Sequence, residues 1–138
     1  MKLLDTKKQQ RQEILLGAIY LLSRLSKYVS LSEIQDCVRH LQRQFQLGYS
    51  FSKRFNCSFE LVTDLRDLVY AGSLHEYNYG NDSFLPKRCF SLTPLGDDQG
   101  RRIASQLSED LLRHLEDTVK RMSETIIKDD AYGLDTSE

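Results

Sequence analysis

The chain has 138 residues, 40% of them hydrophobic, and a formal net charge of −1 at pH 7. This length suits one domain with a buried core and is too short for two. No apolar run approaches the length that spans a bilayer, and the first residues lack the apolar core and the cleavage site of a signal peptide. We therefore expect a cytoplasmic protein that has no membrane partner.

Positive charge is concentrated in the first half of the chain. Up to Ser58 ten Lys and Arg stand against four Asp and Glu, a net charge of +6, whereas the rest of the chain has nine against sixteen, a net charge of −7. Nucleic-acid-binding proteins often show such clustering, although their domains are usually more basic overall. The distribution favours DNA binding, and the total charge does not.

The sequence contains no pattern of residues that is typical of an enzyme or a metal site. Cys37, Cys57 and Cys89 are far apart and are not spaced with a histidine as zinc ligands are. His40 and His114 are expected on the surface, and no nucleophile motif or pair of carboxylates in an apolar setting is present. We expect free, partly buried thiols, one of which is open to a redox-sensing role, and neither catalysis nor a cofactor.

The first predicted helix covers about residues 8–27. Its apolar residues cover a wider arc than a surface helix needs. Two interpretations follow, a central helix of the core or a helix that packs partly on another subunit. Charged residues in or before its first turn are candidates for phosphate contacts or for solubilising charges. The arc comprises Ile14, Leu15, Ala18, Ile19, Leu21, Leu22 and Leu25, and the charged residues are Lys7, Lys8 and Arg11.

The second helix is predicted to begin after Ser30. Ser30 and Glu33 have the spacing of a capping box, and Val29 and Ile34 that of a hydrophobic staple. Gly48 is the expected stop. Residues 49–57 have the spacing of an extended segment, which is longer than the turn of a simple helix-turn-helix. The geometry between the second and third helices therefore stays open.

A third helix is predicted between Ser58, as its N-cap, and Gly72, which ends it in the left-handed conformation. Residues 74–79 and 89–92 alternate apolar and polar side chains, with turn residues between them, and so predict two strands of a hairpin. Thr93-Pro94 then marks a new helix start. This order is typical of a winged helix.

Two motifs in this region match a known family. Residues 65–74 read Leu-x-x-Leu-Val-x-Ala-Gly-Ser-Leu, and residues 90–96 read Phe-Ser-Leu-Thr-Pro-Leu-Gly. Both resemble winged-helix transcription regulators of the PadR and MarR kind, in which a recognition helix ends in a glycine turn and the wing ends in an aromatic-x-Leu-Thr-x-x-Gly motif. The resemblance implies a homodimeric repressor that binds double-stranded DNA at an inverted-repeat operator. Any small-molecule effector stays open.

Beyond Thr93 apolar residues recur every three or four positions, which predicts one long amphipathic helix. Gly96 and Gly100 are expected to loosen its beginning, and Asp97 or Asp98 is a candidate cap for a restart. Such a helix is too long to bury its whole apolar stripe on one small domain, so we expect it to form the dimer interface. The stripe is Ile103, Leu107, Leu111, Leu115, Val119 and Met122.

The expected fold is thus mainly α with a small β-hairpin wing, a winged helix-turn-helix, plus a long C-terminal dimerisation helix. Residues 1–96 are predicted to form the winged-helix DNA-binding domain with its N-terminal helix. Residues 97–128 form the dimerisation helix. Residues 129–138, rich in small and acidic residues, are predicted to be a flexible tail.

The candidate DNA-binding residues lie on the third helix and on both sides of it. On a helical projection Glu60, Asp64 and Asp67 face outward, which is a poor match to a polyanion. Basic and polar residues around the helix favour DNA, with phosphate contacts before the helix and at the end of the wing. The alternative is that these are solvated loop charges and that the winged helix binds another protein through its acidic face. The candidates are Ser52, Lys53, Arg54, Asn56, Ser58, Lys87 and Arg88 for phosphates and Thr63, Arg66 and Tyr70 for bases.

Overall fold

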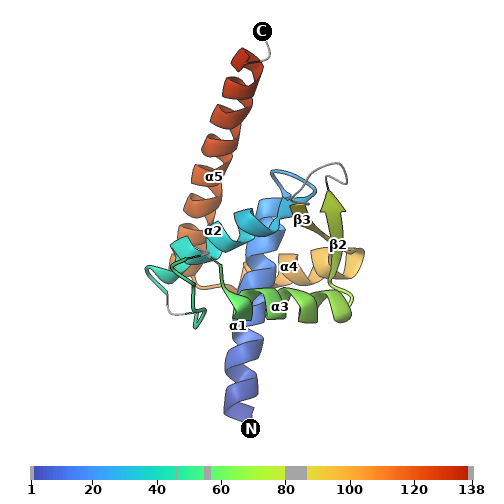
Figure 1. Cartoon of the computed structure of the whole chain (residues 1–138). Helices are drawn as coiled ribbons and strands as arrows, with labels where there is room; N and C mark the ends of the chain where they lie inside the picture. The colour runs from blue at the N-terminus through green and yellow to red at the C-terminus, as the bar shows by residue number, and fades with distance from the viewer. Residues whose placement is uncertain (1, 46, 55–56, 80–86, 137–138) are drawn as a thin grey trace.

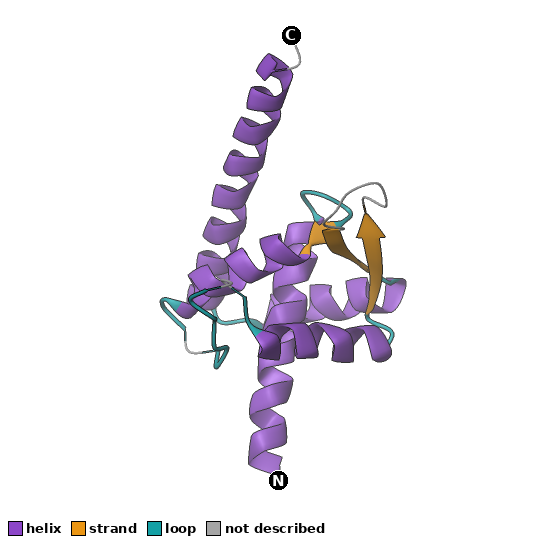
Figure 2. Cartoon of the chain, viewed as in Figure 1, coloured by secondary structure: helices purple, strands orange, loops and turns teal. Residues whose placement is uncertain are grey.

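The structure, a computed structural model, describes residues 2–45, 47–54, 57–79 and 87–136. Within these residues the fold is mainly helical, with a small three-stranded antiparallel sheet (Figures 1 and 2). The helices are α1 (Lys2–Ser23), α2 (Leu31–Gln42), α3 (Phe59–Tyr70), α4 (Pro94–Gln106) and α5 (Glu109–Thr136). The strands are β1 (Val29–Ser30), β2 (Leu74–Tyr79) and β3 (Lys87–Leu92). No helix in this part of the chain is both long and apolar enough to cross a membrane.

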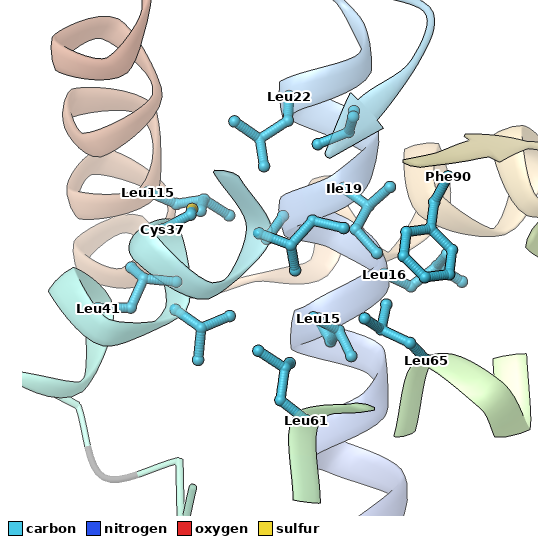
Figure 3. Close-up of a cluster of buried hydrophobic side chains, with 14 of the residues drawn as sticks. Leu15, Leu16, Ile19, Leu22, Cys37, Leu41, Leu61, Leu65, Phe90 and Leu115 are labelled. Atoms are coloured by element: carbon cyan, nitrogen blue, oxygen red, sulfur yellow. The ribbon is translucent and has the colours of Figure 1, made fainter. Parts of the chain in front are cut away.

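Helix α1 is the central helix of the core, as one of the two interpretations predicts. Leu15, Leu16 and Ile19 are buried, and Figure 3 shows α1 between side chains of α2 and α5 on one side and those of α3 and β3 on the other. The wide apolar arc is therefore needed within the chain, because several elements pack around α1. The helix ends at Ser23, so Leu25 lies beyond it and is exposed.

Helix α2 begins as predicted and ends earlier. The Glu33 N–H donates to Ser30 Oγ at 3.1 Å, and the Ser30 N–H donates to Glu33 Oε1 at 3.4 Å, so both halves of the capping box are present. Gly48 adopts φ +87°, but it lies six residues after Gln42 and does not end the helix. The expected stop is wrong, because the chain leaves α2 through a tight turn at Arg43, whose N–H donates to His40 O.

Helix α3 and the two strands of the hairpin form where the sequence predicts them. Ser58 Oγ accepts from the Leu61 N–H, and Gly72, at φ +84°, donates to Val69 O while Ser73 donates to Leu68 O. This pair of bonds is a Schellman motif, which satisfies the last carbonyls of the helix. Strands β2 and β3 then pair in an antiparallel register from Leu74 opposite Leu92 to Tyr79 opposite Lys87.

Strand β1 was not predicted from the sequence. It pairs with β3, with Val29 opposite Phe90, so the strand order is β1-β3-β2. Two residues are too few for an alternating pattern, and Ser30 is already assigned to the capping box of α2. The short strand makes β3 the central strand and places Phe90 in the core (Figure 3).

The prediction of one long C-terminal helix is wrong, because the chain breaks at Leu107 and Ser108. Thr93 caps α4 as expected, with the Gly96 N–H donating to its hydroxyl, and α4 continues through Asp97 and Asp98 without a restart. Leu107 is extended, and Ser108 begins α5 by accepting from the Leu111 N–H at its hydroxyl. The stripe is therefore divided between two helices that pack in different places.

Gly96 and Gly100 permit close packing of α4, and they do not loosen it. A Cβ at Gly96 would lie 1.9 Å from the backbone oxygen of Ser73, and a Cβ at Gly100 would lie 2.6 Å from Cβ of Tyr20. The first glycine brings α4 against the turn between α3 and β2, and the second brings it against α1. These contacts explain the presence of two glycines within one helix, where they otherwise cost stability.

The residues predicted to form a dimer interface pack within the chain. Leu111, Leu115 and Val119 are buried in the core, where α5 lies against α2. The other three, Ile103, Leu107 and Met122, are partly buried and pack against the same core. The interface prediction is therefore wrong for Leu111, Leu115 and Val119, because the break before α5 lets this part of the stripe fold back onto the domain. For Ile103, Leu107 and Met122, which stay partly exposed, it remains a prediction.

Helix α5 continues far beyond the core. It runs to Thr136, so most of the predicted flexible tail is helical, and Figure 1 shows its C-terminal half projecting away from the other elements. Side chains from residue 123 onward lie outside the described part of the structure.

Candidate nucleic-acid interface

Four exposed side chains form a single stripe along α3. Phe59, Thr63, Arg66 and Tyr70 are spaced by four, three and four residues, which places them on one side of a helix. Phe59 is 75% exposed and Tyr70 81% exposed, although both are large and aromatic. The opposite side of α3, with Leu61, Leu65 and Leu68, is buried in the core. We call the four exposed residues the α3 stripe.

Asp64 does not face outward, which corrects the helical projection. Its side chain is 0% exposed, with Arg11 Nε 2.7 Å from Oδ2 and Arg11 Nη2 3.1 Å from Oδ1. Tyr49 donates its hydroxyl to the same Oδ2 at 2.6 Å, and Gln12 donates to Oδ1 at 3.3 Å. A carboxylate tolerates such burial only when it is paired and hydrogen-bonded.

Asp67, one turn further along α3, is also paired with α1. Lys8 Nζ lies 3.0 Å from its Oδ2, and Gln12 donates to the same oxygen at 3.1 Å. Lys8 and Arg11 are therefore engaged with α3, and we do not place them among the phosphate contacts. Two of the three carboxylates that made α3 a poor match to DNA have cationic partners within the chain.

The pairing also holds the loop that leads into α3. Tyr49 is buried, and the Arg11 guanidinium lies 4.8 Å from the centre of the Tyr49 ring. The Gln42 side chain binds the backbone of Tyr49 twice: Gln42 Oε1 accepts from the Tyr49 N–H at 2.6 Å, and Gln42 Nε2 donates to the Tyr49 carbonyl at 2.9 Å. Burial, reinforced by the bond to Asp64, raises the pKa of Tyr49 above its ordinary value. The bond to Asp64 raises the pKa of Arg11, which stays protonated. Sequence reasoning missed this cluster, because the side chains that bind Asp64 lie 15 to 53 residues away from it in the chain.

The candidates that precede α3 differ in their availability. Lys53 and Arg54 are exposed, whereas Ser52 is partly buried and donates its N–H to Cys57 O at 2.8 Å. Ser58 is completely buried, caps α3 and donates its N–H to Gln35 Oε1 at 2.9 Å. The prediction of a phosphate contact by Ser58 is therefore wrong, since its hydroxyl is enclosed. Asn56 lies outside the described residues.

At the other end of the candidate surface, Arg88 of β3 forms an ion pair with Glu76 of β2 at 2.6 Å. Lys87 also belongs to β3, but its side chain lies outside the part of the chain that the structure describes. Arg88 is half-buried. Because its guanidinium already donates to Glu76, a phosphate contact would require Arg88 to share the guanidinium between Glu76 and the phosphate.

The three cysteines are thiols outside any disulfide, and all are at least partly buried, as predicted. Cys37 and Cys89 are buried, and Cys57 is partly exposed. Burial raises the pKa of the Cys37 thiol to about 12, which leaves it protonated and unreactive at neutral pH. Among the described residues no group of three acidic, cysteine or histidine side chains is arranged to hold a metal ion.

A hollow of about 530 Å³ lies between α2 and α5 and is lined by charges of both signs. His40 and His114 both line it. Partial burial lowers the pKa of His40, and the nearby charges of Arg43 and Arg39 lower it further. The His114 ring packs edge-on against Phe45 at 5.3 Å. This mixed lining defines no class of ligand.

Comparison of the chain with protein-family models, with curated proteins and with solved structures finds no match.

Proposed function

We propose that the chain is a winged-helix DNA-binding protein that presents the α3 stripe to the major groove of double-stranded DNA. The observation that carries the proposal is the engagement of the α3 carboxylates. Asp64 and Asp67 are held by Arg11, Lys8 and Gln12, and the exposed side of the helix carries one arginine between two aromatic residues. Helices enter the major groove and read base edges through such side chains.

The arrangement of the elements supports this reading. A three-stranded sheet whose hairpin follows the third helix, with a short strand before the second helix, is the order expected of a winged helix. Lys53 and Arg54 precede α3 in the chain, and Arg88 follows it on the hairpin, so cationic residues flank this helix on both sides in the sequence. Positions on both sides of a reading helix suit contacts to the phosphate backbone.

Arg66 is the strongest candidate for reading a base. It is exposed and forms no ion pair with any other described residue, so its guanidinium is available to the O6 and N7 acceptors of guanine. Thr63 and Tyr70 lie one turn to either side of it. Lys53, Arg54 and Arg88 then fix the position of the protein on the duplex without reading its sequence.

The proposal includes a homodimer that acts as a cytoplasmic transcriptional repressor, in keeping with the PadR and MarR resemblance. We place the dimer contact at the projecting end of α5 and not at the buried stripe. There the helix continues for more than three turns beyond Met122 (Figure 1). In size and closing helix the chain is also similar to the cyanobacterial circadian period-extender protein, so a role in circadian timing is the narrowest form of the proposal.

The test begins with selection of bound duplexes from a random-sequence pool by the full-length protein. The selected duplex is then titrated at increasing salt with wild type, with a Lys53→Ala, Arg54→Ala double variant and with Lys120→Ala, a control on the exposed side of α5. We expect the affinity of the wild type to fall steeply with salt, and the slope to flatten by about 0.9 units for each phosphate contact that the double variant loses.

A different class of function is favoured by one observation, the exposure of Phe59 and Tyr70, because aromatic residues are enriched at protein interfaces. Under this alternative the α3 stripe binds another protein and does not read DNA. Failure to select any duplex, or binding that does not respond to salt, would overturn the DNA-binding proposal and favour this one.

A further inference from the structure

The N-terminal half of the α3 stripe contains an apolar surface that Arg66 does not explain. Phe59, at the first position of α3, is 75% exposed, and contact of its apolar ring with water is unfavourable. Its neighbour on the stripe, Thr63, donates its hydroxyl to the Phe59 carbonyl at 2.9 Å. Because the O–H of that hydroxyl is engaged with the helix backbone, Thr63 offers a partner its methyl group and the acceptor lone pairs of the oxygen, but no donor.

A methyl group in the major groove is a partner that matches this surface. Thymine carries one at C5, and the pairings known for it are apolar contacts with phenylalanine and with the methyl group of threonine. The charges around the surface favour a polyanion over a protein, because Lys53 and Arg54 precede the helix and Arg66 follows on the same stripe.

We propose that Phe59 and the methyl group of Thr63 bind the C5-methyl group of a pyrimidine in the major groove and so determine part of the sequence preference. This inference rests on the proposed function. The same methyl group is presented by thymine and by 5-methylcytosine, so both bases fit the surface.

The spacing along α3 predicts where that pyrimidine lies. Arg66 lies seven positions after Phe59, which corresponds to about 10 Å along a helix and to about three base-pair steps. We therefore expect the pyrimidine within about three base pairs of the guanine that Arg66 contacts.

The experiment replaces each thymine of the selected duplex in turn with deoxyuridine, which removes only the methyl group. Binding to the full-length protein should weaken about fourfold at one or two positions, the equivalent of burying one methyl group. In Phe59→Ala the same replacement should have almost no effect. Leu25→Ala, which truncates an exposed apolar residue outside α3, should respond as the wild type does.

A second arm distinguishes the two sources of the methyl group. Each thymine–adenine pair that responds is replaced by a cytosine–guanine pair, with and without methylation at C5. Recovery of affinity on methylation shows that the methyl group itself is read, and no recovery shows that the protein reads thymine by its other groups as well.

The outcomes separate this inference from the proposed function. If a duplex is bound specifically and no deoxyuridine weakens binding, or if Phe59→Ala responds like the wild type, the inference is wrong while DNA binding stands. If no duplex is selected at all, both are wrong. Circular dichroism of Phe59→Ala confirms that the variant is folded, as its exposure predicts.

Discussion

The guanidinium of Arg11 in α1 lies 2.7 Å from the buried carboxylate of Asp64 in α3, and this pair joins the central helix to the helix that carries the exposed stripe. Asp64 → Ala should therefore destabilise the protein by about 3–5 kcal/mol, because it leaves a cation without its partner inside the fold. Urea unfolding measures the loss. Asp98→Ala, which removes the partner of Arg101 and Arg102 on the surface of α4, is the control and should change little. Similar losses in both variants would contradict the structural role of the pair.

The raised pKa of Tyr49 predicts that the free energy of unfolding decreases at alkaline pH. Its pKa is raised in the folded state, so the folded protein holds the phenolic proton more tightly than the unfolded chain does. The stabilisation is fully present below the ordinary pKa of about 10 and decreases as the pH rises above it.

Tyr49→Phe tests this dependence. Loss of the bond to Asp64 should lower the free energy of unfolding at neutral pH by about 1.5–3 kcal/mol. Between about pH 9 and pH 11 the variant should lose less stability than the wild type, since the other tyrosines are common to both. Urea titrations across this range give the difference. Parallel curves would show that Tyr49 does not titrate as its burial requires.

The close contact at Gly96 predicts whether Gly96→Ala stabilises or destabilises the protein. Helix propensity alone favours Gly96→Ala by up to about 1 kcal/mol. The added Cβ would meet the backbone oxygen of Ser73, which no side-chain rotation can move away. We therefore expect Gly96→Ala to be destabilised by about 1–3 kcal/mol, the usual range for overpacking. Ser105→Ala, on the exposed side of the same helix, is the matched control in thermal unfolding and should retain or gain stability. A more stable Gly96→Ala would refute the close contact.

Local signals in the sequence predicted where three of the helices begin and where α3 ends. The capping box of Ser30 and Glu33, the cap at Ser58, the Gly72 turn and Thr93-Pro94 all involve residues within a few positions of one another. Such motifs depend on backbone groups that every helix end leaves unpaired, so they can be recognised without knowledge of the tertiary structure.

The features that sequence reasoning missed depend on distant residues. The burial of Asp64 requires Arg11 and Tyr49, and no pattern within α3 distinguishes a paired carboxylate from a solvated one. The break at Ser108 was obscured by an apolar period that continues across it, although Ser108 followed by Glu109 and Asp110 was a readable helix start. The helical projection placed Thr63 and Tyr70 outward, where the structure has them, but it put Arg66 on the flank and misjudged Asp64, which is buried and paired.

If the protein dimerises as proposed, the projecting end of α5 should be necessary for the dimer. The same segment should not be needed for the fold of the single chain. A chain truncated after Met122 retains Leu111, Leu115 and Val119, the buried residues in the described part of α5, and should remain folded. Sedimentation velocity at micromolar concentration should give a dimer for the full chain and a monomer for the truncated one. A monomeric full chain, or a truncated chain that still dimerises, would contradict the proposed contact.

The central claim is that Arg66 on the α3 stripe reads a base, and one titration tests it most directly. Wild type, Arg66→Ala and the control Arg24→Ala are each titrated with the selected duplex and with a scrambled duplex of the same composition. We predict that Arg66→Ala loses about 1–3 kcal/mol of binding free energy on the selected duplex and almost none on the scrambled one, whereas Arg24→Ala resembles the wild type. An equal loss on both duplexes, or no loss on either, would contradict the account.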